Sequence, residues 1–104
     1  MDVFEKIKST INQNDYEKNK IPISDIAHHE GGYTIVELSN NENPCGYYEC
    51  FHAEKEFGSM RIVLSITTSD NYRSFGNDEE PYHNVALLYN GDNLVDKYEY
   101  TYFE

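Results

Sequence analysis

Basic residues are scarce in this chain, and the shortage falls on one part of it. The 104 residues include 8 Lys and Arg against 19 Asp and Glu, for a formal net charge of −11. Residues 1–20 hold four acids and four lysines, so the whole imbalance lies in residues 21–104. No Lys or Arg occurs between Lys20 and Lys55, or between Arg73 and Lys97. Without clustered basic side chains, direct binding to nucleic acid or to an anionic membrane is not expected.

Long apolar runs, targeting signals and a cysteine framework are also missing. No stretch approaches the roughly 20 apolar residues of a membrane-spanning helix. Residues 1–6 show no basic region followed by an apolar one, so we expect no signal peptide. Cys45 and Cys50 are the two cysteines, too few to imply a disulfide scaffold. Together these absences favour a cytoplasmic protein.

Motifs for catalysis, phosphate binding and metal binding are absent from the sequence. It contains no Gly-x-Ser-x-Gly, no Gly-x-x-x-x-Gly-Lys and no His-Glu-x-x-His. Cys45 and Cys50 stand five positions apart, wider than a zinc-knuckle gap, and the adjacent His28 and His29 would face opposite ways on a strand. We therefore expect no enzymatic activity, no cofactor and no metal site. A role for a histidine as a general base remains an alternative. Two side chains that the fold brings together as an acid–base pair would show no motif in the sequence.

Composition leaves a choice between a folded and a disordered chain. The mean hydropathy of −0.76 and the high net charge lean toward disorder. Against that, 14% of the residues are aromatic, and several runs are dense in β-branched and aromatic residues. We expect one folded domain spanning residues 1–104, with long polar loops.

The N-terminal segment has the spacing of an amphipathic helix. Phe4, Ile7 and Ile11 recur at intervals of three and four, and Lys8 lies on the other side. Asp2 followed by a glutamate three residues later has the spacing of a capping box. Weak helix formers at residues 12–15 predict where the helix ends.

From residue 21 onward the pattern indicates β-structure. Residues 24–30 fit either a short capped helix or the first arm of a hairpin turning at Gly31 and Gly32, and we favour the hairpin. Strands are expected over residues 33–38, 45–53, 60–67, 83–89 and 94–103, separated by polar turns. The predicted class is α+β, with the N-terminal helix packed on an antiparallel meander sheet of about five to six strands.

Residues 69–82 form an unusually long connection for a compact domain, and such connections are often functional. It combines an acidic triplet with aromatic side chains, which suits a partner rich in Lys and Arg, although a solvated loop is the simpler alternative. The candidate partner-binding residues are Asp70, Tyr72, Asp78, Glu79, Glu80 and Tyr82. A second aromatic set (Tyr98, Tyr100 and Tyr102) shares one face of the last strand, where packing is favoured over a binding surface.

In its size, strong negative charge, tyrosine-rich loops and lack of catalytic motifs, the chain resembles the small acidic immunity proteins of bacterial toxin–immunity systems, including those of contact-dependent growth inhibition. The resemblance lies in overall style and carries no individual functional residue. It implies an antitoxin without catalytic activity of its own that binds its cognate toxin domain and blocks it. Because a nuclease must hold phosphates in a basic cleft, we expect the partner to be a basic toxin domain, foremost a nuclease, whose active site the chain occludes. We expect the free chain to be a monomer.

Two other functions remain open at this stage. A phage-type nucleic-acid mimic that blocks a host defence effector would carry a similar negative charge. A small enzyme or ligand-binding domain would instead need a concave pocket holding a perturbed histidine.

Overall fold

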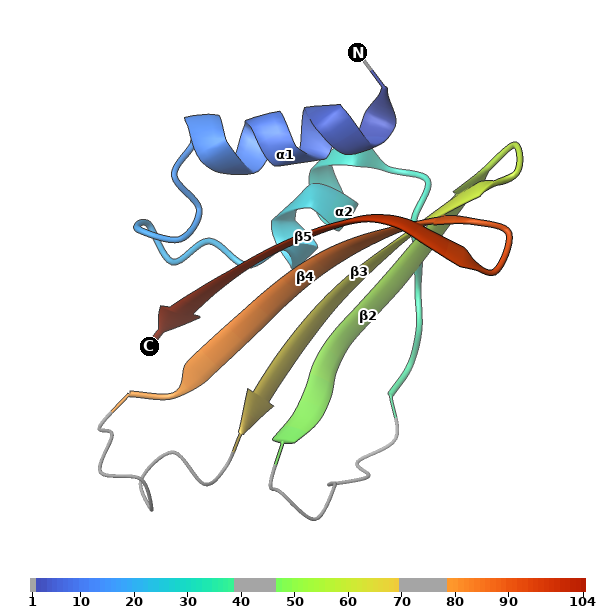
Figure 1. The fold of residues 1–104 in the computed structure, drawn as a ribbon. Coiled ribbons are helices and arrows are strands. Elements are labelled where there is room, and N and C mark those ends of the chain that lie inside the picture. The colour runs from blue at the N-terminus through green and yellow to red at the C-terminus, as the bar shows by residue number, and fades with distance from the viewer. Residues whose placement is uncertain (1, 39–46, 70–78) are drawn as a thin grey trace.

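The computed structural model describes residues 2–38, 47–69 and 79–104 (Figure 1). The α+β class and the antiparallel meander are confirmed, because five strands form one sheet in the order β1-β2-β3-β4-β5, with every neighbouring pair antiparallel. The elements are α1 (Val3–Gln13), α2 (Ser24–Glu30), β1 (Thr34–Ile35), β2 (Tyr47–Phe57), β3 (Met60–Ser69), β4 (Pro81–Asn90) and β5 (Asn93–Phe103).

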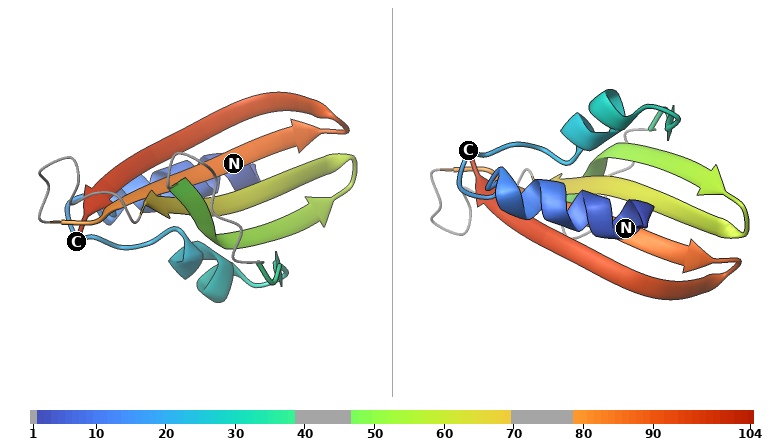
Figure 2. Two further views of the ribbon diagram at one scale, coloured as in Figure 1. Left: turned by 90° about the horizontal axis from the view of Figure 1, so that it is seen from below. Right: turned by 90° about the horizontal axis from the view of Figure 1, so that it is seen from above.

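Helix α1 begins and buries its side chains as its sequence predicts. The Asp2 carboxylate accepts a hydrogen bond from the Glu5 amide at 2.8 Å, which satisfies one of the free N–H groups of the first turn. Phe4, Ile7 and Ile11 are buried in the hydrophobic core. Figure 2 shows α1 running over the sheet on the same side as α2.

The favoured hairpin at residues 24–30 is wrong, since this segment is helix α2. Two tertiary contacts outweigh its weak local preference. Ile26 and Ala27 are buried in the core, and the amide of Ile23 at the helix start is bound by the side chain of Asn84 on β4. Gly31 ends the helix with a φ of 73°, and the following strand β1 is reduced to two residues.

Two tight turns set the register of the long strands. Phe57 pairs with Met60 across the β2–β3 turn, and Asn90 pairs with Asn93 across the β4–β5 turn. Gly58 and Gly91 lie in these turns with φ near +60°, a conformation that glycine adopts without a Cβ penalty.

The sheet has two unequal faces. The face toward the helices, here called the helix face, holds the core residues Ala53, Ile62, Leu64, Ile66, Ala86, Leu88, Tyr100 and Tyr102. The burial of Tyr100 and Tyr102 agrees with the predicted packing role of the tyrosines of the last strand. No described helix lies over the opposite face, here called the open face (Figure 2). Within the described residues, neither helix is long and apolar enough to cross a membrane.

Candidate partner-binding face

The predicted acidic connection lies only partly within the described structure. Asp70, Tyr72 and Asp78 fall outside the described residues. Glu79 is exposed just before β4. Glu80 follows it and exchanges two backbone hydrogen bonds with Glu104, at 2.8 and 3.0 Å, which extends the β4–β5 ladder by one pair.

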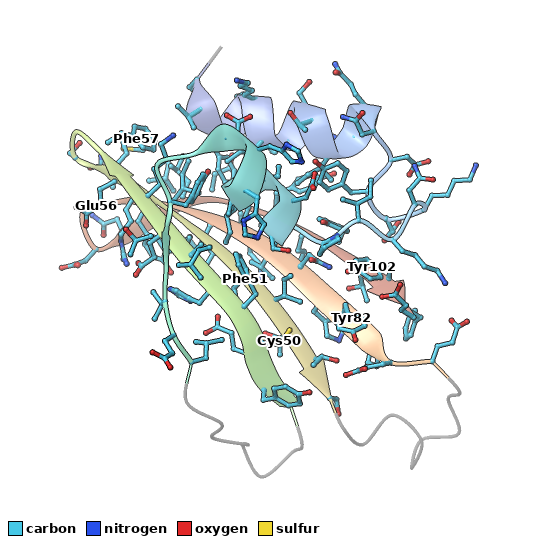
Figure 3. All side chains as sticks on the ribbon, turned by 180° about the vertical axis from the view of Figure 1, so that it is seen from behind. Cys50, Phe51, Glu56, Phe57, Tyr82 and Tyr102 are labelled. Atoms are coloured by element: carbon cyan, nitrogen blue, oxygen red, sulfur yellow. The ribbon has the colours of Figure 1, made fainter. Side chains whose placement is uncertain are left out.

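Glu80 and Tyr82 have structural contacts in addition to their predicted binding role. The Tyr82 hydroxyl donates to one Glu80 oxygen at 2.9 Å, and the Thr68 hydroxyl lies 2.9 Å from the other. The Tyr82 ring stacks on Tyr102 with centroids 5.5 Å apart (both rings are labelled in Figure 3). Burial, and then the bond to Glu80, raise the pKa of Tyr82 well above its ordinary value. Of the predicted residues that the structure describes, Glu79 is exposed, and Glu80 and Tyr82 are half-buried.

The open face presents a mixed surface from four long strands. Cross-strand pairing and the alternation of side chains place its members. They are Glu49, His52, Glu54 and Glu56 of β2, Arg61, Val63, Ser65 and Thr67 of β3, His83, Val85, Leu87 and Tyr89 of β4, and Lys97, Glu99, Thr101 and Phe103 of β5.

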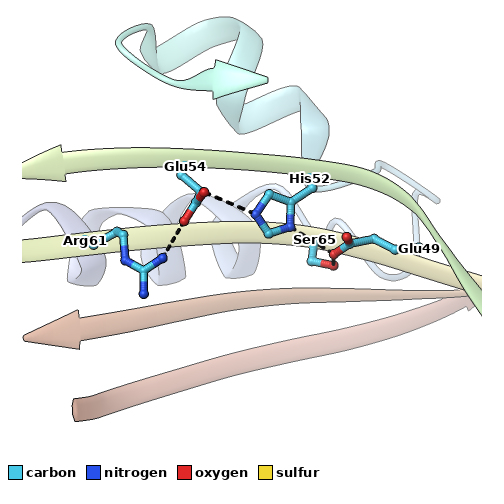
Figure 4. A network of polar contacts seen from close by, with 5 residues as sticks. All are labelled: Glu49, His52, Glu54, Arg61 and Ser65. Carbon is cyan, nitrogen blue, oxygen red and sulfur yellow. Dashed lines mark hydrogen bonds and ion pairs between the residues drawn. The ribbon is translucent and has the colours of Figure 1, made fainter. Parts of the chain in front are cut away.

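A network of polar contacts fixes two of these glutamates (Figure 4). The Ser65 hydroxyl donates to Glu49, and Nδ1 of His52 lies 3.1 Å from the same carboxylate oxygen. Nε2 of His52 lies 3.5 Å from Glu54, whose other oxygen accepts from Arg61 at 2.5 Å. Each ring nitrogen of His52 thus faces a carboxylate oxygen, one of Glu49 and one of Glu54. The network therefore holds the Glu49 and Glu54 carboxylates in place.

This network was missed by sequence reasoning for a physical reason. His52 and Glu54 are two residues apart and fall on one face by simple alternation. Glu49 has the opposite parity and reaches that face because a bulge between Glu49 and Phe51 shifts the register. No feature of residues 45–53 marks the bulge, and the partners on β3 are known only from the pairing.

Beside the network lies an apolar centre with a further cation. Val63 is 5% exposed although it points to the open face, and Val85 and Leu87 beside it are half-buried. The Arg61 guanidinium lies 4.7 Å from the centre of the Tyr89 ring, a cation–π contact. The open face thus combines apolar contact area with charged side chains, four of which are glutamates against one arginine and one lysine.

A hollow between the helices is the second candidate site. A cavity of about 300 Å³ is lined by residues of α1, of α2 and of the turn between them. Asp25 dominates its chemistry, with one oxygen 3.0 Å from the Tyr16 hydroxyl and the other 3.1 Å from His29. Burial and the bond to Asp25 raise the pKa of Tyr16 to about 12. Glu30, also in the lining, pairs with Lys6 at 3.4 Å, so the acids of this hollow have partners within the chain.

The part of the chain that the structure describes contains no candidate metal site. There, no three His, Cys, Asp or Glu side chains are grouped closely enough to hold an ion. Cys50 is a free thiol, and Cys45 lies outside the described residues.

Comparisons with known proteins found no match among protein-family models, curated proteins or solved structures.

Proposed function

We propose that this chain is an immunity protein that binds a basic cognate toxin domain in the cytoplasm and occludes its active site, with a nuclease as the foremost candidate toxin. The observation that carries the proposal is the open face, where fixed carboxylates surround an apolar centre. In this proposal α1 stays packed on the helix face, and the open face meets the toxin.

Nuclease clefts suit such a face because they are built to hold phosphates. A cleft lined by Lys and Arg attracts a surface of opposite charge and can pair with its carboxylates. Carboxylates already held by neighbours lose little freedom on binding, so more of the interaction energy appears as affinity. Glu49 and Glu54 meet this condition, and their side chains remain about one third exposed.

Apolar contact and long-range attraction have separate roles in the proposed complex. The dissociation rate depends on the apolar surface that loses contact with water in the complex. In this proposal that surface belongs to Val85, Leu87 and Tyr89. The net charge of −11 steers the toxin and raises the association rate by roughly 10- to 1,000-fold at low salt. The sequence-predicted binding residues of the acidic connection remain part of this proposal as further toxin contacts: Asp70, Tyr72, Asp78, Glu79, Glu80 and Tyr82.

The first experiment identifies the partner. Tagged protein is purified from its source cell at low and at high salt, and the co-purified domain is then assayed for nuclease activity with and without the immunity protein. Recovery of one basic toxin domain whose activity is blocked supports the proposal. A host defence complex recovered instead would point to the nucleic-acid mimic.

Two charge-matched variants then test the face. The first carries Glu54→Gln, Glu56→Gln and Glu99→Gln on the open face, and the control carries Glu5→Gln, Asp15→Asn and Glu17→Gln near the helix side. Both lose three negative charges, so steering weakens equally, and only the first loses contacts in the complex. We expect the open-face variant to raise the dissociation constant at least about tenfold over the control, about 1.4 kcal/mol. Equal losses would show that the open face is not the interface.

A further inference from the structure

We propose that the outer edge of β5 pairs antiparallel with the same edge of a second copy, forming a continuous ten-stranded sheet. Strand β5 is the last in the sheet order, and among the described elements it has a neighbour on one side only. Both views in Figure 2 show its outer side free of other described elements. An uncovered strand edge presents unpaired N–H and C=O groups, which is a template for another strand.

The Glu80–Glu104 pair shows which residues of β5 point their backbone groups toward β4 and which point them toward the free edge. Glu104 and Glu80 exchange both backbone hydrogen bonds, so residue 104 points toward β4. Such pairs alternate along an antiparallel ladder, and the β4–β5 register is regular from residue 96 to residue 103. The backbone groups of Lys97, Glu99, Thr101 and Phe103 therefore point to the free edge. The Lys97 amide donates a hydrogen bond to the adjacent Asp96 carboxylate at 2.8 Å, a contact that pairing with a second copy would replace.

The charges of β5 select one symmetric register. With the two-fold axis at Tyr98, Lys97 of each copy lies opposite Glu99 of the other, and their outward backbone groups form hydrogen-bonded pairs. Opposite charges placed across strands stabilise a sheet, and like charges destabilise it. Moving the axis to residue 97 or to residue 99 would instead set two lysines or two glutamates opposite each other.

The same register brings the exposed apolar ends of the two strands together. Leu94, Val95 and Phe103 are about half exposed, near the two ends of β5. With the axis at Tyr98, the beginning of each strand runs beside the end of the other copy's strand. Because Leu94 pairs with Tyr89 while Asp96 pairs with Leu88, the irregularity at residue 95 puts Leu94 on the open face, the face that also carries Phe103. The dimer therefore brings Leu94 and Val95 of one copy toward Phe103 of the other.

Net charge opposes this dimer and makes it dependent on salt. Two chains of −11 repel each other, so the sequence-based expectation of a monomer applies at low ionic strength. The Debye length falls from about 14 Å at 0.05 M to about 4 Å at 0.5 M salt, which screens the repulsion more than it weakens contacts within the interface. A single strand pair buries little area, so the dimer is a weak one.

Sedimentation equilibrium at about 0.05 M and about 0.5 M NaCl tests the proposal. We expect the dimer fraction at high protein concentration to rise with salt, with an association constant at least about tenfold larger at the higher salt. Glu99→Lys sets lysines opposite lysines and should abolish the dimer, although it lowers the net charge to −9. The control Glu37→Lys has the same net charge, but Glu37 is exposed just after β1, at the opposite edge of the sheet, so this variant should dimerise at least as well as the natural chain.

A charge swap separates lost complementarity from a folding defect. The double variant Lys97→Glu, Glu99→Lys restores the cross-strand pairs at the original net charge and should recover the dimer. The Glu99 side chain is 62% exposed, so these variants should keep the melting temperature of the natural chain. A natural chain that stays monomeric at high salt, or a Glu99→Lys chain that dimerises like it, would overturn the proposal. The outcome does not depend on any toxin.

Discussion

Asn84 joins helix α2 to the sheet, and its removal should have a large effect on stability. Its side chain is fully buried within the apolar helix face. Oδ1 accepts from the Ile23 amide at 2.9 Å, and Nδ2 lies 3.2 Å from the carbonyl oxygen of Tyr82. The substitution Asn84→Ala leaves a buried N–H without a partner, at a cost of about 1–3 kcal/mol, and loses a second bond of about 1 kcal/mol. Adding the small void, we expect a loss of about 3 kcal/mol in the free energy of unfolding.

Urea denaturation of the Asn84→Ala variant, with Asn90→Ala as the control variant, measures this loss of stability. Asn90 lies exposed on the same strand, and its substitution should change the stability by less than about 0.5 kcal/mol. The melting temperature of Asn84→Ala should fall by about 12 °C or more, given about 4–8 °C per kcal/mol for a domain of this size. Amide exchange should accelerate first at Ile23 and in α2. A loss below about 1 kcal/mol would refute the view that this side chain holds α2 to the sheet.

Three further predictions concern the core, the open face and alkaline pH. Ile7→Ala should cost about 2–5 kcal/mol in urea denaturation, because Ile7 of α1 is fully buried, and a cost below about 1 kcal/mol would contradict that burial. Arg61→Ala should cost about 1 kcal/mol or less, since its ion pair with Glu54 is partly exposed, and a larger loss would mean that the network also stabilises the fold. Burial raises the pKa of Tyr16 and of Tyr33 to about 12 from an ordinary value of 10, so the stability these residues contribute below pH 10 should be lost as the pH rises toward 12. Phenolate absorbance would show this delay, and ordinary titration of every tyrosine near pH 10 would contradict it.

Local signals in the sequence predicted the parts of the fold that depend on neighbours along the chain. Helix α1 has its apolar spacing and its Asp2 cap within a few residues, and both are confirmed. The four long strands were predicted from runs of β-branched and aromatic residues, with alternation at residues 60–67 and a turn at Gly91, and their described ends differ from the prediction by up to four residues. Helix α2 was missed because the Asn84 contact that stabilises it lies 61 positions away in sequence.

The candidate site shows the same division. The charge imbalance and the long polar connections are visible in the sequence, and they predicted the acidic connection as the binding site. The open face is assembled by pairing across four strands, and its central network needs the bulge before Phe51 to bring Glu49 beside His52. A sequence shows which residues alternate, but it does not show where one extra residue shifts the alternation.

Salt distinguishes the two proposed interactions, because they depend on the net charge with opposite sign. The toxin complex joins unlike charges, so raising NaCl from about 0.05 M to about 0.5 M should slow its association by roughly tenfold or more. The β5 dimer joins two chains of −11, so the same change should strengthen it. Measuring toxin association and dimer fraction across one salt series therefore tests both with a single preparation. If both strengthened with salt, the toxin complex would be governed by apolar contact, and the acidic surplus would have no steering role.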